Sequence, residues 1–81
     1  MKQSEVSQEL VWCGLGDWNQ PADTIKEYEA YGEGKLSMAY VYPDGTLALR
    51  DGYGKDLWKG IPEDGDQICD LLTQFGHYAA C

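Results

Sequence analysis

Residues 40–60 read YVYPDGTLALRDGYGKDLWKG, and the turn signals in this stretch decide the fold class. In Pro43-Asp44-Gly45, proline fixes φ at the first turn position and glycine adopts positive φ without steric cost. The flanking residues 35–42 and 46–50 are rich in the aromatic and aliphatic side chains that favour strands. A second turn at residues 51–54 leads to a short strand around Leu57 and Trp58. The stretch therefore predicts a three-stranded antiparallel β-meander.

The first turn also fixes which side chains share a face of the hairpin. The cross-strand pairs expected from a three-residue turn are Tyr42 with Thr46, Val41 with Leu47, and Ala39 with Leu49. The side chains expected on the other face are those of Met38, Tyr40, Tyr42, Thr46, Ala48 and Arg50. One face is thus aliphatic and the other aromatic and mixed, so we expect helices to cover the aliphatic face.

Helices are predicted near both ends of the chain. Residues 4–13 carry apolar side chains at helical spacing, with Ser4 to cap the start and Gly14 to end the helix. The apolar stripe of the C-terminal helix consists of Ile68, Leu71, Leu72 and Phe75. The acidic residues that favour its N-terminal dipole are Glu63, Asp64 and Asp66. Gly76 is placed to end this helix.

Residues 21–31 carry two conflicting signals. Pro21 suits the first position of a helix and Gly32 would stop it, which predicts a second N-terminal helix. The alternate positions Ile25, Glu27, Glu29 and Tyr31, however, also fit the spacing of a strand. The expected fold is α+β, with the meander packed against the C-terminal helix and one or two short N-terminal helices. Residues 1–81 are expected to form one small globular domain.

Charge and cysteine content narrow the classes of function. Fourteen carboxylates against six basic residues give a net charge of −8, which disfavours attraction to nucleic acid or to anionic lipid. No stretch approaches the roughly 20 apolar residues that span a bilayer. Three widely spaced cysteines are typical of a reduced, cytosolic setting, which is the host cytoplasm if a phage encodes the chain. A protein with a basic surface is the complementary partner.

Motifs for catalysis or cofactor binding are not found in the sequence. The nominal zinc ligands are Cys13, Cys69, His77 and Cys81, but they lack the close Cys-x₂-Cys pairs of structural zinc sites. A small enzyme could use carboxylates or Cys69 with His77. The thiol would need an electropositive site, and this chain is acidic, while nothing marks two carboxylates as embedded among apolar residues. We therefore expect no catalytic residue, no metal and no cofactor.

Residues 44–58, DGTLALRDGYGKDLW, resemble one repeat of the bulb-type mannose-binding lectins, whose strands carry Gln-x-Asp-x-Asn-x-Val-x-Tyr. In an alignment on Asp44, the other four motif positions fall on Tyr42, Thr46, Ala48 and Arg50, so only the aspartate matches. The chain has no second repeat, whereas that architecture depends on several. The resemblance implies an alternative function, a carbohydrate-binding module that uses the hairpin region Tyr40–Gly60.

Acidity combined with aromatic side chains favours a non-enzymatic function in protein binding. Grouped carboxylates can imitate nucleic-acid phosphates, and tyrosine and tryptophan are frequent anchors of interfaces. The expected function is a small intracellular inhibitor that blocks the basic groove of a DNA- or RNA-handling protein, by analogy with phage anti-defence proteins such as anti-CRISPRs. The alternative is that the acids cap a helix and solubilise the fold while the aromatics fill its core. The predicted partner-binding residues are Glu27, Glu29, Glu33, Tyr40, Tyr42, Tyr53, Trp58, Glu63, Asp64, Asp66 and Asp70.

Overall fold

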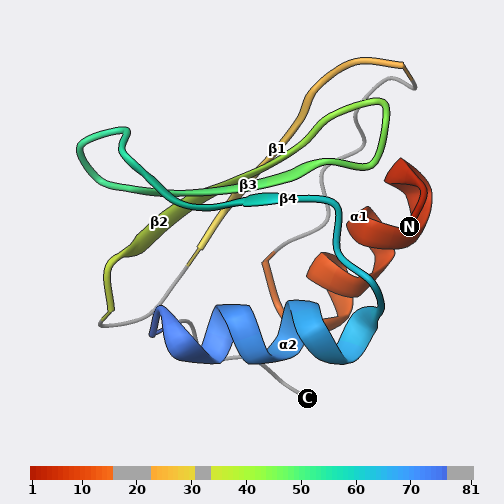
Figure 1. The fold of residues 1–81 in the computed structure, drawn as a ribbon. Helices are drawn as coiled ribbons and strands as arrows, with labels where there is room; N and C mark the ends of the chain where they lie inside the picture. Colours follow the sequence, from red (N-terminus) through yellow and green to blue (C-terminus); the bar gives the residue numbers. More distant parts are fainter. Residues whose placement is uncertain (16–22, 31–33, 77–81) are drawn as a thin grey trace.

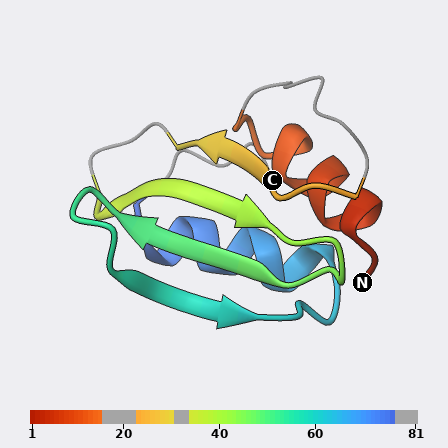
Figure 2. The same cartoon turned by 90° about the horizontal axis from the view of Figure 1, so that it is seen from above.

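The chain folds into two layers, a four-stranded antiparallel sheet and a pair of helices on one of its faces (Figure 1). The computed structural model describes residues 1–15, 23–30 and 34–76. The elements in chain order are α1 (Gln3–Trp12), β1 (Lys26–Glu29), β2 (Leu36–Val41), β3 (Leu47–Asp51), β4 (Asp56–Gly60) and α2 (Gly65–Gln74). The strands follow one another across the sheet in chain order, and the face away from the helices carries no helix among the described residues (Figure 2).

The register of the β2–β3 hairpin is the one predicted from its turn. Val41 pairs with Leu47 and Ala39 with Leu49. The Tyr42 N–H donates to the Thr46 carbonyl over 2.9 Å, which closes the turn. Gly45 has φ +94°, and the Asp44 carboxylate accepts from the Thr46 N–H at 2.9 Å. The turn chemistry therefore determines the pairing.

The α+β fold with an antiparallel sheet is confirmed, but the sheet has four strands where three were predicted, because residues 26–29, which carried both helix and strand signals, form a strand. β1 pairs with β2, and Tyr28 lies opposite Ala39. Tyr28 is 2% exposed, whereas Glu27 and Glu29 are exposed. Period-2 alternation thus buries the one aromatic side chain of the strand, which a helix with only rough apolar periodicity would not do. Pro21 and Gly32, the helix signals, lie outside the described residues.

Each helix is capped by a carboxylate. In α1 the Glu5 carboxylate accepts from the Lys2 N–H at 2.9 Å, so the helix starts earlier than the predicted Ser4 cap. In α2 the N-cap is Asp64, whose Oδ1 accepts from the Gln67 N–H at 2.8 Å. The prediction that acidic residues support the start of the C-terminal helix is confirmed at Asp64.

The core lies between the sheet and the helices, as the aliphatic face of the hairpin predicts. Its fully buried side chains with 0% exposure include Val6, Leu10, Val41, Leu47, Leu49, Ile68 and Leu72. Burying each aliphatic side chain of this size contributes about 1.5–3 kcal/mol. At the end of α2, Gly76 packs against Gly34 so closely that a methyl group on either would meet backbone. The Leu36 N–H donates there to the Phe75 carbonyl over 3.2 Å, which ties α2 to the start of β2.

Candidate functional site

The open face of the sheet carries two tyrosines whose rings are covered by basic side chains. The Arg50 guanidinium lies 5.0 Å from the centre of the Tyr40 ring, and the Lys59 ammonium lies 5.4 Å from that of Tyr42. Arg50 Nε also donates to Asp56 Oδ1 at 2.9 Å, and this carboxylate raises the pKa of the guanidinium. Ala48 is on the same face, between Tyr40 and Lys59, yet it is 0% exposed. The long side chains therefore close over the middle of this face.

This arrangement bears on the carbohydrate alternative. A sugar would stack on an accessible tyrosine ring. However, Arg50 covers one face of the Tyr40 ring, and Lys59 covers one face of the Tyr42 ring. Asp44, the one residue that matches the lectin motif, accepts backbone and side-chain hydrogen bonds from Thr46, which lower its pKa. The hairpin side chains are thus engaged with one another, which does not favour sugar binding.

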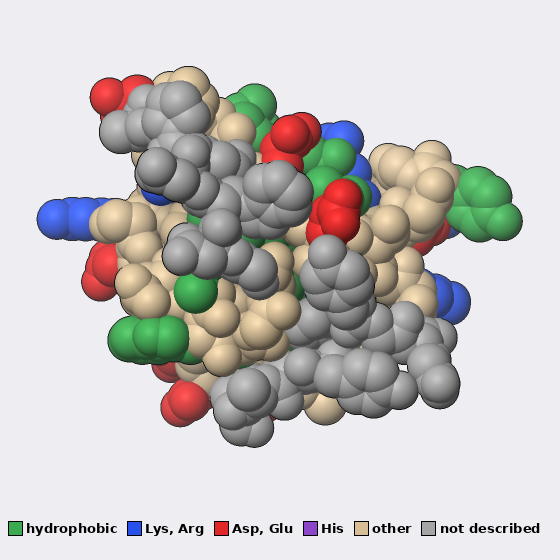
Figure 3. All heavy atoms as spheres, turned by 180° about the vertical axis from the view of Figure 1, so that it is seen from behind, with side chains coloured by type: hydrophobic (Ala, Val, Ile, Leu, Met, Phe, Trp, Pro, Cys, Tyr) green, Lys and Arg blue, Asp and Glu red, His purple; other side chains and the backbone are tan. Residues whose placement is uncertain are grey.

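Charge is divided unequally between the two layers. The sheet layer, residues 23–30 and 34–60, has six carboxylates and five basic residues. The helix layer, residues 1–15 and 61–76, has six carboxylates and one basic residue, Lys2. Seen from behind, acidic side chains lie at the upper left, near the middle and at the lower left, and lysine and arginine side chains lie at the left, the top and the right (Figure 3). The two layers therefore hold equal numbers of carboxylates, and the net charge of the helix layer is the more negative because it holds only one basic residue.

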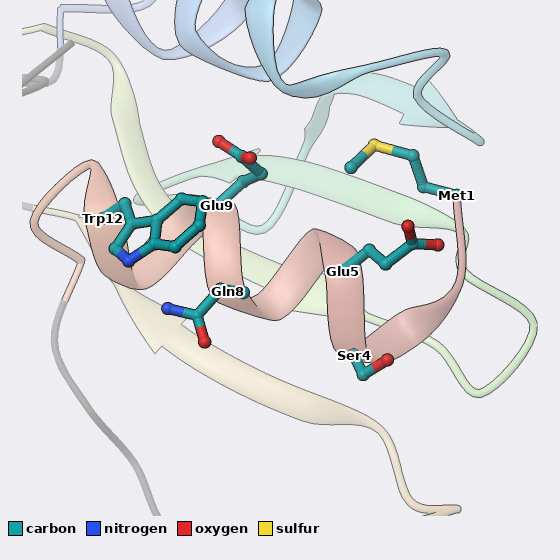
Figure 4. A pocket seen from close by; sticks show the side chains of 6 residues that line it. All are labelled: Met1, Ser4, Glu5, Gln8, Glu9 and Trp12. Carbon is teal, nitrogen blue, oxygen red and sulfur yellow. The ribbon is translucent and has the colours of Figure 1, made fainter.

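The helix layer also contains a hollow along the outer side of α1, with a volume of about 390 Å³. Its lining residues are Met1, Ser4, Glu5, Gln8, Glu9 and Trp12. Trp12 is 64% exposed, and its indole lies along the helix beside Glu9 (Figure 4). The Glu9 carboxylate reaches the first turn of α2, where a Cβ added to Gly65 would lie 2.5 Å from Glu9 Cδ. The hollow thus combines an exposed aromatic ring with carboxylates of the helix layer.

The predicted partner-binding residues do not form one surface. Glu27, Tyr40 and Tyr42 lie on the open sheet face, because Glu27 pairs with Tyr40. Tyr53 is 99% exposed in the β3–β4 turn. Trp58 pairs with Leu49 on the covered face and packs against the core. The residues in or immediately before α2 are Glu63, Asp64, Asp66 and Asp70. Glu29 belongs to β1, and Glu33 lies outside the described residues.

Sequence analysis missed the contribution of α1 to the acidic layer. Glu5, Glu9 and Trp12 follow one another at spacings of four and three residues, which places them along one side of a helix. The buried residues of α1, Val6 and Leu10, lie on another side. This spacing is present in the sequence and is the signal that places Trp12 beside the two carboxylates.

The cysteines differ from the reduced state that their number predicts. Cys69 is disulfide-bonded, and its partner is not among the described residues. Cys13 is a buried thiol that forms no disulfide with a described residue, and its pKa is raised first by burial and then by the Glu9 carboxylate. Within the described ranges no three His, Cys, Asp or Glu side chains could share a metal ion, and His77 and Cys81 lie outside those ranges. Neither of the helices that the structure describes is long and apolar enough to cross a bilayer.

Comparison with known proteins gives no relative for this chain, since no protein-family model, curated protein or solved structure matches it.

Proposed function

We propose that this protein is a non-enzymatic binding domain whose helix layer occupies the basic groove of a protein that handles DNA or RNA, and so inhibits it. The observation that carries this proposal is the unequal division of charge between the layers. The carboxylates of the helix layer are accompanied by one basic residue and those of the sheet layer by five, so the net negative charge favours the helix side, where a basic groove could accept it in place of phosphates.

The helices present their carboxylates outward. In α2 the buried residues are Ile68, Leu71 and Leu72, so Asp66 and Asp70 project away from the sheet by helical spacing, and both are exposed. Within the described residues, no lysine or arginine belongs to either helix. Basic groups that could neutralise these acids locally are therefore confined to Lys2, the chain terminus and the sheet layer.

Helix capping explains only part of this acidity. Asp64 caps α2 and Glu5 caps α1, and both positions are favourable next to a helix N-terminus. Asp70 lies beyond the first turn of α2, where the helix dipole gives it no such benefit. Acidity at Asp70 is consistent with a surface selected for its charge.

The proposal is tested by capture of partners on the immobilised full-length chain in an extract of its native cell, followed by competition. A captured partner is purified, and duplex DNA or RNA is added to its complex with this protein. We expect nucleic acid to displace the protein, and we expect binding to weaken steeply between 50 and 300 mM salt. Simultaneous binding of protein and nucleic acid would contradict the proposal.

Matched charge variants locate the binding surface. One variant neutralises helix-layer acids that cap nothing, through Glu63→Gln, Asp66→Asn and Asp70→Asn. The other neutralises as many acids of the sheet layer, through Asp23→Asn, Glu27→Gln and Glu29→Gln. The helix-layer variant should lower affinity for the partner about tenfold or more, and the sheet-layer variant less than about threefold. Equal losses would show that net charge alone, and not its position, determines binding.

A further inference from the structure

We propose that the hollow on α1 receives one arginine side chain of the partner, which stacks on Trp12 and forms an ion pair with Glu9. This inference rests on the proposed function and specifies the side chain that the helix layer recognises.

Trp12 lies outside the hydrophobic core that the described residues form. It lies at the end of α1 and is 64% exposed, whereas the core residues of the same helix, Val6 and Leu10, are 0% exposed. Tryptophan is buried on average, and exposed tryptophans are enriched among the residues that dominate protein interfaces. The indole is therefore largely exposed where it lines the hollow (Figure 4).

Glu9 supplies the charge beside that ring. It lies three residues before Trp12 on α1, so both side chains lie on the same side of the helix. Its position against Gly65 keeps the carboxylate at the junction of α1 and α2. Neither helix carries a lysine or arginine that would compete for it. Glu5 lies one turn away and lines the same hollow, although it also accepts from the Lys2 N–H at 2.9 Å.

This combination of groups favours arginine over the other side chains. A guanidinium is planar, so it can stack on an indole and donate to a carboxylate at the same time. A lysine ammonium makes the same charge contact but stacks less well and holds its hydration more strongly. An anionic ligand is disfavoured because Glu5 and Glu9 both line the hollow. A similar combination exists on the open sheet face. There the Arg50 guanidinium lies over the Tyr40 ring and forms an ion pair with the Asp56 carboxylate.

The experiment titrates the full chain with two synthetic peptides, acetyl-(Ala-Arg)₄-amide and acetyl-(Ala-Lys)₄-amide, at 150 mM NaCl. Binding is followed by ¹H–¹⁵N spectra, in which a Trp12→Phe variant identifies the Trp12 indole N–H signal. We expect the arginine peptide to shift this signal and to bind about threefold or more tightly than the lysine peptide. Trp12→Ala should bring the ratio of the arginine-peptide affinity to the lysine-peptide affinity to about one. Glu9→Gln should lower the affinity for the arginine peptide about twofold to fivefold.

Two controls separate the site from general acidity. Tyr53→Ala removes an aromatic side chain that is 99% exposed in the sheet layer, and Asp23→Asn removes one charge there. Both should leave the peptide affinities unchanged within about twofold. The inference is overturned if neither peptide binds, if the two bind equally, or if Trp12→Ala keeps the preference for arginine. None of these results touches the proposed function, which fails separately if the helix-layer charge variant still binds the captured partner.

Discussion

The two exposed sides of this molecule use charge in opposite ways. On the open sheet face, Arg50 and Lys59 lie on the tyrosine rings, and Arg50 also forms an ion pair with Asp56. On the helix layer, six carboxylates accompany a single lysine. A face whose charges are internally paired contributes to its own stability, whereas unpaired like charges raise the free energy of the fold. This difference is the basis of our proposal that the helix layer meets a partner.

The largest expected effect comes from a residue that joins the two layers. Ile68 of α2 is 0% exposed within the shared core, and Ile68→Ala removes buried apolar atoms and leaves a cavity. It should lower the free energy of unfolding by about 2–5 kcal/mol. Urea denaturation followed by circular dichroism measures this change. An unfolding free energy within about 0.5 kcal/mol of wild type would mean that α2 is not packed on the sheet as described.

A smaller change in stability should distinguish the open sheet face from the helix layer, when one charged residue of each is replaced. Arg50→Ala removes a ring contact and an ion pair on the sheet face and uncovers Ala48, which is 0% exposed. The melting temperature should fall by roughly 2–5 °C. Asp70→Asn, which removes one of the like charges of the helix layer, should leave the melting temperature unchanged or raise it by about 1–2 °C. The account of the two faces is wrong if Asp70→Asn is the more destabilising change.

The β2–β3 turn predicts a modest dependence of stability on pH. Hydrogen bonds from Thr46 lower the pKa of Asp44, so the ionised carboxylate stabilises the folded state. This contribution is complete above the pKa of the unfolded chain, about 3.9, and is lost as pH falls through the lower folded pKa. Asp44→Ala should therefore be slightly less stable than wild type at pH 7, and the difference should disappear near pH 2. A difference that persists at pH 2 would assign the effect to the backbone of the turn instead.

The least perturbing test labels thiols and leaves the fold intact. Cys13 is a buried thiol outside any disulfide with a described residue, and Cys69 is disulfide-bonded, so native protein without reductant should not react with iodoacetamide at either residue. Unfolding without reductant should expose Cys13 alone, and added reductant should expose Cys69 as well. Peptide mass spectrometry reads out both sites. Labelling of Cys69 before reduction would show that Cys69 is reduced, as the sequence predicted.

The parts of the fold that could be predicted from the sequence are those set by local chemistry. The turn at Pro43-Asp44-Gly45 fixes the hairpin register, and the apolar stripe around Ile68 and Leu72 defines α2. The strand at residues 26–29 was harder, because its pairing with β2 is a long-range contact that outweighs local helix signals. The candidate site was only half predicted. The number of acidic residues can be read from the sequence. Which of them lie apart from the lysines and arginine depends on which segments form the helix layer.

The central claim, that negative potential is concentrated over the helices, can be measured in solution without any partner. Cationic and anionic nitroxide co-solutes enhance the relaxation of nearby amide protons, and the ratio of the two enhancements reports the electrostatic potential at each amide. The account predicts that exposed amides of α1 and α2 favour the cationic probe more strongly than exposed amides of β3 and β4 do. Equal ratios over the two layers would contradict it.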